Sequence, residues 1–124
     1  MITPHMFDPS FNDKRDVVER LSSVLGIDVL YAPYQPSSDE FDIGKTFEML
    51  KRVDFFVADL SYERPSCYFE VGFVQAMNRP INLIAVDGTN IHQVLNKDKI
   101  KYYAQLYDYE KLIESIIRFQ MLMR

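Results

Sequence analysis

Two acidic residues near the middle of the chain, Asp59 and Glu70, have side chains that can act as general acids, general bases or nucleophiles. Asp59 comes at the end of the apolar run 55–60, and Glu70 stands among aromatic and apolar neighbours. A carboxylate in apolar surroundings is costly unless another group pairs with it or uses it. Each residue also has a structural interpretation. Asp59 could cap the following turn through backbone N–H groups, and Glu70 could pair with Arg64, Arg79 or a tyrosine.

Four further polar residues lie where loops are expected and could contact a ligand. Ser66 is beside the predicted start of a helix, where a hydroxyl and exposed N–H groups suit an anion, and Arg64 is close to it in the sequence. His5 is expected in the first loop, after a short strand within residues 1–7, and Asn90 follows the strand predicted at 81–86. The alternatives are an ordinary helix N-cap for Ser66 and plain polar loop positions for His5 and Asn90.

Metal and disulfide chemistry are not indicated by the sequence. Cys67 is the single cysteine of the chain, and no cluster of Cys and His residues has the spacing of zinc ligands. We therefore expect no disulfide, no metal and no cofactor, and a reducing compartment, the cytoplasm, as the location.

Helices and strands that alternate along the chain must position these residues. Apolar residues at helical spacing predict helices, and continuous apolar runs predict buried strands. The helices are expected at 12–25, 43–52, 65–78 and 109–122, and the strands at 1–7, 27–31, 55–60, 81–86 and 102–106. This order favours an α/β fold, namely a doubly wound, flavodoxin-like parallel sheet of five strands in the order 2-1-3-4-5. The runs 55–60 and 81–86 are expected to be adjacent central strands.

The place of a ligand follows from such a fold. In open parallel sheets, ligands bind beyond the carboxyl ends of the strands, at the point where the strand order reverses. This rule selects the segments 5–10, 59–66 and 87–92. The polar residues of these three segments are therefore the first candidates for binding.

Length, charge and hydropathy exclude several classes of protein. The 124 residues fit one domain, residues 1–124, which can form a core without disulfides or metal. A net charge of -4, with scattered Lys and Arg, argues against a nucleic-acid polymer as partner. The chain has neither a signal-peptide pattern nor an apolar run long enough to span a bilayer, so we expect neither secretion nor membrane insertion.

Three stretches in the centre of the chain form a pattern: Val57-Ala58-Asp59-Leu60, Glu70-Val71-Gly72-Phe73 and Arg79-Pro80-Ile81. This pattern resembles the nucleoside 2-deoxyribosyltransferase-like family and its TIR-like relatives. In that family an apolar strand ends in Asp or Asn, and a short polar loop, Glu-Leu-Gly-Tyr-Ala and Lys-Pro follow. The likeness extends from about residue 7 to residue 117. It departs from the family at Phe73, where the family has Tyr, and in the first loop, which lacks the usual Gly-containing segment.

The resemblance implies cleavage or transfer at the N-glycosidic bond between a sugar and a nucleobase. The family's Glu, which acts at the anomeric carbon, corresponds to Glu70, and the acid that positions the sugar or the leaving base corresponds to Asp59. Ser66 matches a position that holds a 5′-phosphate in nucleotide-cleaving relatives. We therefore predict a nucleotide or nucleoside N-glycosidase or deoxyribosyltransferase-like enzyme with a small nucleoside or nucleotide as its ligand.

Other interpretations remain open at this point. A TIR-like relative could instead cleave the nicotinamide bond of NAD, and a degenerate relative could bind or sense a nucleotide without catalysis. The resemblance also implies sites that are completed across subunits. Together with the four tyrosines Tyr102, Tyr103, Tyr107 and Tyr109, which exceed the needs of a small core, it predicts a homo-oligomer.

Overall fold

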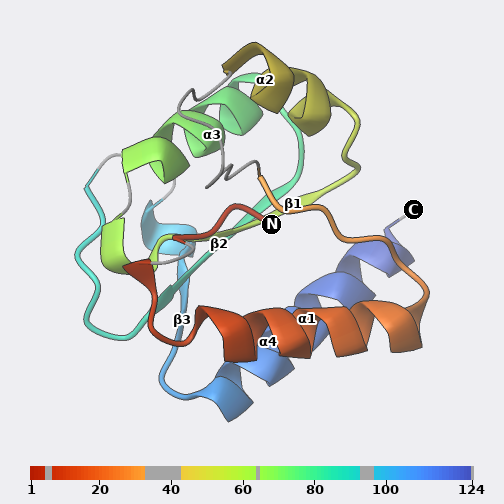
Figure 1. Cartoon of the computed structure of the whole chain (residues 1–124), viewed down its shortest axis with the longest axis vertical. Helices are drawn as coiled ribbons and strands as arrows, with labels where there is room; N and C mark the ends of the chain where they lie inside the picture. Colours follow the sequence, from red (N-terminus) through yellow and green to blue (C-terminus); the bar gives the residue numbers. More distant parts are fainter. Residues whose placement is uncertain (5–6, 33–42, 64, 93–96, 124) are drawn as a thin grey trace.

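Helices and strands alternate along most of the chain in the computed structural model, which describes residues 1–4, 7–32, 43–63, 65–92 and 97–123 (Figure 1). The helices are α1 (Phe11–Leu25), α2 (Ile43–Lys51), α3 (Pro65–Ala76) and α4 (Leu106–Leu122). The strands are β1 (Phe56–Asp59), β2 (Ile81–Val86) and β3 (Lys101–Tyr103), and short 3₁₀ turns lie at η2 (Ser61–Glu63) and η3 (Lys97–Lys99). The predicted α/β class is confirmed, and so are the four predicted helices, within a few residues at their ends.

The three strands form a parallel sheet in the order β1-β2-β3. β1 pairs with β2 from Phe56 opposite Ile81 to Asp59 opposite Ile84, which confirms the two apolar runs as adjacent parallel strands. All four residues of β1 are buried, as expected for a strand that helices cover on both faces.

The outer predicted strands differ from the structure. Residues 27–31 are not assigned as a strand, and the segment 1–7 contributes only an isolated parallel bridge between Ile2 and Ala58. The sheet of the described residues therefore has three strands instead of the five predicted. The predicted strand 102–106 is β3 at 101–103, because the backbone N–H of Gln105 donates to Asp108 Oδ2 at 3.0 Å in a capping box that starts α4 at Leu106.

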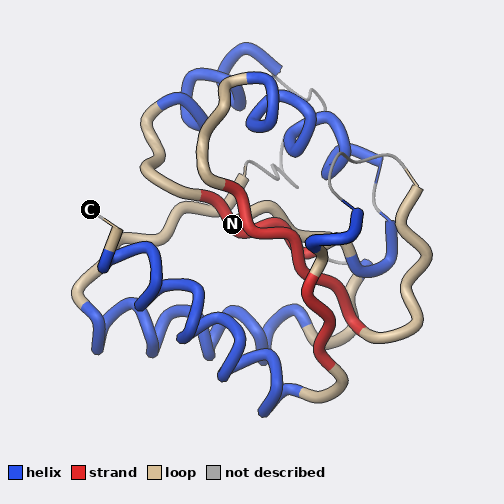
Figure 2. The backbone as a smooth tube through the Cα atoms, turned by 180° about the vertical axis from the view of Figure 1, so that it is seen from behind, coloured by secondary structure: helices blue, strands red, loops and turns tan. Residues whose placement is uncertain are grey.

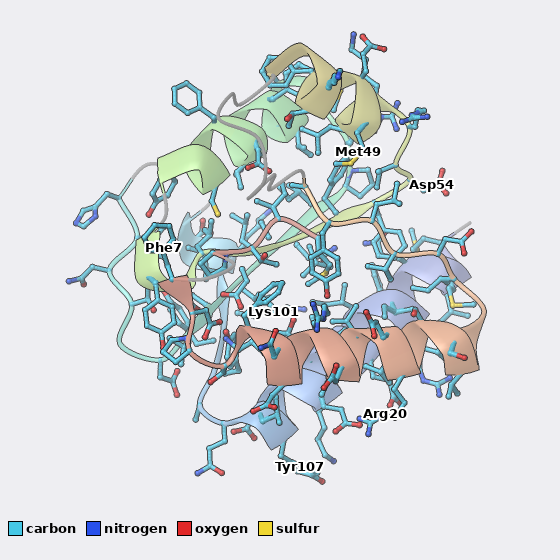
Figure 3. The ribbon with its side chains drawn as sticks, in the orientation of Figure 1. Phe7, Arg20, Met49, Asp54, Lys101 and Tyr107 are labelled. Carbon is cyan, nitrogen blue, oxygen red and sulfur yellow. The ribbon has the colours of Figure 1, made fainter. Side chains whose placement is uncertain are left out.

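Two helical layers enclose the sheet, with α1 and α4 on one face and α2 and α3 on the other (Figure 2). Alternate residues of β1 face alternate layers. Phe56, Ala58 and Leu60 belong to the core on the α2/α3 side, whereas Val57 belongs to the core on the α1/α4 side. Arg20 on α1 and Tyr107 on α4 lie on the outer faces of their helices and point away from the sheet (Figure 3).

The described helices can be compared with the requirements of a membrane-spanning helix. None of them combines the length and the apolar character that crossing a bilayer requires.

Candidate functional site

Asp59 ends β1 and lies in a buried polar network on the α1/α4 side of the sheet. Its residue exposure is 1%, and its Oδ1 accepts hydrogen bonds from the Ser61 N–H at 3.0 Å and the Ser61 hydroxyl at 2.6 Å. Its Oδ2 accepts the hydroxyl of Tyr103 at 2.7 Å and the ammonium of Lys14 at 3.5 Å. A carboxylate has about four acceptor positions, and these four donors occupy them. The alternative in which Asp59 caps the following turn is therefore present in the structure.

Lys14 is the cation of this network and projects from the first turns of α1. Its ammonium donates to Asp8 Oδ2 at 2.5 Å and to the Tyr103 hydroxyl at 2.5 Å, in addition to Asp59. These three acceptors match the three donors of an ammonium group. The ammonium also lies 4.7 Å from the ring centroid of Tyr103 and 5.4 Å from that of Tyr109. Lys14 thus joins the loop before α1, the end of β1 and the end of β3.

Ser61 and Tyr103 complete the network and connect it to β2. The N–H of Val86 donates to Ser61 Oγ at 2.8 Å, so the carboxyl end of β2 is fixed to the turn after β1. Burial, and after it the negative charge of Asp59, raises the pKa of Tyr103 well above its usual value of 10. Tyr103 therefore stays a neutral hydroxyl that donates to Asp59. Five charged or polar side chains are thus held as one unit, namely Asp8, Lys14, Asp59, Ser61 and Tyr103.

Cavities of very different size lie at the two ends of the parallel strands. A cavity of about 10 Å³ borders the network, with Asp8, Lys14 and Asp59 among its lining residues. Such a volume holds about one water molecule and no nucleoside. A cavity of about 650 Å³, large enough for a small ligand, lies among residues 26–30 and 52–55, before the start of β1. Asp59, Glu70 and Asn90, the predicted site residues whose side chains the structure describes, do not line this larger cavity, which lies at the end of the sheet opposite to the carboxyl ends of the strands.

Glu70 lies on α3 and is 1% exposed. Residues one helical turn away on the same face of α3 are Cys67 and Val74, and Val71 adjoins them, all buried at 1% or less in the core on the α2/α3 side. The Cys67 thiol donates to the backbone carbonyl of Thr3 at 3.3 Å, which holds the first turn of α3 against the segment next to β1. Glu70 is therefore a carboxylate on the apolar, sheet-facing side of its helix.

The structure does not bring Asp59 and Glu70 together. All side-chain partners of Asp59 come from the α1/α4 side or from its own turn, whereas α3 packs on the opposite face of the sheet. The physical reason is the alternation of side chains along β1, which assigns Asp59 to the face shared with Val57 and not to that of Ala58.

The other predicted site residues are only partly described. His5 and Arg64 lie outside the described residues, and so does the side chain of Ser66. Asn90 is exposed in the loop after β2. Arg79, one possible partner of Glu70, donates instead to the Val53 carbonyl at 2.5 Å.

The two residues that follow Glu70 in the resemblance have structural environments of their own. Phe73 stacks on Phe47 of α2, with ring centroids 4.0 Å apart and planes within 5° of parallel. This position, where the family has Tyr, therefore serves the contact between two helices. A Cβ built at Gly72 would meet nothing within 4 Å, so close packing does not require a glycine there.

Lys14 and Tyr103 were not among the residues that the sequence predicted for the site, and Asp8 and Ser61 lie in the selected segments 5–10 and 59–66 but were not singled out there. Lys14 did carry a signal, because it precedes Val17, Val18 and Leu21 at helical spacing and so stands on the buried stripe of α1. A charged residue on such a stripe indicates a buried partner. The partners themselves, distant in sequence, follow only from the fold.

Comparison with known proteins leaves the family undecided. The chain matches no model of a protein family and no curated protein.

Proposed function

We propose that this protein is an enzyme that breaks the bond between the sugar and the base of a nucleoside or nucleotide, with Glu70 acting at the anomeric carbon. The observation that carries the proposal is the burial of Glu70, 1% exposed on the apolar side of α3, the helix that follows the carboxyl end of β1. A carboxylate there is costly unless another group pairs with it or a reaction uses it, and we propose the second. The Glu-X-Gly-aromatic pattern around Glu70 adds the resemblance to enzymes of this class.

The chemistry suits a carboxylate with a fixed position. When the glycosidic bond breaks, its electron pair leaves with the base, and the sugar passes through an oxocarbenium-like state that a nearby carboxylate stabilises. A Glu70 oxygen then forms a bond to the anomeric carbon, and water or a second base releases the sugar from it. Protonation of the departing base makes it a better leaving group, and this is the role that the resemblance assigns to Asp59.

The contacts of Asp59 favour a second candidate function for the chain. Its four acceptor positions are occupied by Lys14, Tyr103 and Ser61, so it is held as a structural carboxylate. A chain that binds a nucleotide but lacks the second acid is a nucleotide-binding module without catalysis. The role of Asp59 as an acid stays a prediction.

Ligand contacts are proposed at the loops that follow β1 and β2. We propose that Ser66, at the start of α3, and Arg64 bind a 5′-phosphate, since the N-terminus of a helix attracts anions. His5 and Asn90 are proposed to contact the rest of the ligand. A phosphate held there would orient the anomeric carbon toward Glu70 through binding energy from a remote group. NAD is the alternative substrate.

We also propose the five-stranded order 2-1-3-4-5 for the whole sheet. Ile2 donates to the Val57 carbonyl at 2.9 Å and accepts from the Asp59 N–H at 2.8 Å, which supports a parallel strand beside β1. The Ala32 N–H donates to the Met1 carbonyl at 2.8 Å, which supports a further strand outside it.

A homo-oligomer in the cytoplasm is the proposed state of the protein. Of the four tyrosines behind this proposal, Tyr103 and Tyr109 are buried in the core at 3% and 2%, whereas Tyr102 and Tyr107 are exposed at 47% and 64%. The support thus comes from two tyrosines instead of four. The molar mass measured by light scattering at micromolar concentration tests the oligomer, and the mass of a monomer would refute it.

The deciding experiment is base release from a panel of nucleosides, nucleoside 5′-monophosphates and NAD, followed by chromatography. The wild type should release base from at least one of these substrates, and Glu70→Gln should reduce the rate by about 10³-fold or more. Glu48→Gln, which changes an exposed glutamate of α2, is the matched control and should leave the rate unchanged. Binding without base release would establish the non-catalytic module, and unchanged release by Glu70→Gln would remove Glu70 from the chemistry.

A further inference from the structure

Tyr62, in the turn η2 directly after β1, has a backbone conformation that is unusual for its residue type. Its φ of 63° and ψ of 9° place it in the left-handed region. The other described residues with such a φ are Gly26, Gly88 and Asn78, which are types that tolerate it. For an aromatic residue this conformation costs on the order of 1 kcal/mol.

Packing does not explain the aromatic side chain at this position. Tyr62 is 50% exposed, so it contributes little to the core. The turn requires a left-handed residue but not a tyrosine, since Asn or Gly would form it with less strain. The aromatic side chain is therefore available at the surface for a contact with a ligand.

The neighbours of Tyr62 hold this conformation firmly. Ser61 is fixed by Asp59 on one side and by the N–H of Val86 on the other. The Leu60 N–H donates to the Ile84 carbonyl at 2.8 Å. Strained residues persist where the surrounding structure over-determines them. The buried network of Lys14 and Asp59 thus braces the backbone of the turn that carries this exposed aromatic residue.

The location of Tyr62 indicates what such a ring binds. It stands at the carboxyl edge of the parallel sheet, where ligands of this architecture bind, and it precedes α3, which carries Glu70. Glu70 lies about 7.5 Å along the helix axis from the first residue of α3, given a rise of about 1.5 Å per residue. Tyr62 and the start of α3 therefore lie at the same end of the sheet, where the nucleotide of the proposed function would bind.

We propose that Tyr62 stacks on the nucleobase of the ligand and is held for this purpose by the turn that Asp59 and Ser61 brace. This inference rests on the proposed function, because it names a base-binding residue of the same site. A preformed aromatic face contributes affinity without an ordering cost at binding. It discriminates ligands with a base from those with only a sugar phosphate.

Calorimetric binding of adenosine 5′-monophosphate and of ribose 5-phosphate tests the proposal. The measurements use Glu70→Gln as the parent so that bound nucleotide is not consumed. Adding Tyr62→Asn should weaken binding of the nucleotide by about 5- to 150-fold, the range for loss of one stacked base. Binding of ribose 5-phosphate should not change, and Tyr62→Phe should retain the affinity of the parent for both ligands. Phe69→Ala removes a 68% exposed aromatic of α3 and is the matched control with unchanged affinity.

Melting temperature separates this role from a structural one. Because Asn adopts the left-handed conformation more readily, Tyr62→Asn should melt at the same temperature as the parent or higher. A lower melting temperature, with equal losses of affinity for both ligands, would make Tyr62 structural and overturn the proposal. If the parent binds the nucleotide and Tyr62→Asn binds it equally well, stacking is refuted while the proposed function stands. If neither wild type nor parent binds any nucleotide, both fail.

Discussion

Two buried carboxylates, each 1% exposed, lie on opposite faces of the sheet in very different surroundings. Asp59 is enclosed by an ammonium, two hydroxyls and a backbone N–H, which occupy all of its acceptor positions. Glu70 stands on a helix face whose neighbouring residues Cys67, Val71 and Val74 are apolar. The same chemical group is therefore a brace in one place and a candidate reactive group in the other.

Burial of an acidic side chain does not by itself distinguish a structural acid from a reactive one. A buried acid with a full set of donors from rigid elements contributes to the specificity of the fold, and removing one partner leaves an uncompensated charge. A buried acid on an apolar helix face is costly unless another group pairs with it or a reaction uses it, so burial by itself does not decide between the two. Variants that change one region and not the other test this contrast.

The largest effect is expected from Lys14→Met. Removing the ammonium leaves Asp8 and Asp59 buried without their cation, and the free energy of unfolding at neutral pH should fall by about 3–5 kcal/mol. Denaturant unfolding measures it. Lys51→Met, which removes an exposed partner of Glu48, is the control and should change stability by less than about 1 kcal/mol. A Lys14→Met protein that stays stable but loses base release would make the network part of the reactive site.

Tyr103→Phe should have the next largest effect. The hydroxyl that it removes donates to Asp59 and accepts from Lys14, so its loss should cost about 1–3 kcal/mol at neutral pH. Thermal or denaturant unfolding provides the value. A loss equal to that of the half-exposed Tyr102→Phe would argue against a cooperative network.

The same tyrosine predicts an alkaline loss of stability. The native state holds Tyr103 protonated, whereas the unfolded chain releases this proton above a pH of about 10. Its contribution is therefore fully present below pH 10 and decreases as the pH rises above it. Burial also raises the pKa of Tyr31 to about 12, which adds to the same limb. Tyr103→Phe should flatten the decline of unfolding free energy above pH 10, and an unchanged slope would contradict the burial of a neutral hydroxyl.

Glu70→Gln should change stability by no more than about 1 kcal/mol, in either direction. The amide keeps nearly the same volume, and the lower cost of burying a neutral group offsets the lost attraction between the carboxylate and the N-terminal ammonium of Met1. The free energy of unfolding is to be compared with that of Glu48→Gln. A loss of about 3 kcal/mol or more would make Glu70 a structural pair like Asp59 and end the contrast between the two acids.

The smallest effect is expected from Arg20→Ala on the surface of α1. Its guanidinium pairs with Glu110 of α4, but both side chains are partly exposed, at 57% and 34%. Such pairs contribute about 0.2–1 kcal/mol, and added salt should weaken this one. A loss as large as that of Lys14→Met would mean that exposure does not distinguish the two α1 cations.

Local patterns in the sequence were sufficient for the helices and for the two central strands. The run 55–60 and the run 81–86 are apolar and short, which only a doubly covered parallel strand explains well, and the structure pairs them side by side. Helix ends were less accurate where side chains decide them. Asp108 closes a capping box with Gln105, so α4 begins three residues before the predicted Tyr109.

The sequence also singled out Asp59 and Glu70 as unusual acids, because each interrupts an apolar stretch. Only the tertiary structure decided that they face different layers, since that depends on which side of β1 each helix covers. Lys14 and Tyr103, which donate to Asp59, and Asp8, which Lys14 links to it, come from segments whose proximity to β1 no local pattern encodes. Local propensity acts over a few residues, whereas the neutralisation of a buried charge is settled by whichever distant groups the packed layers place within hydrogen-bond reach.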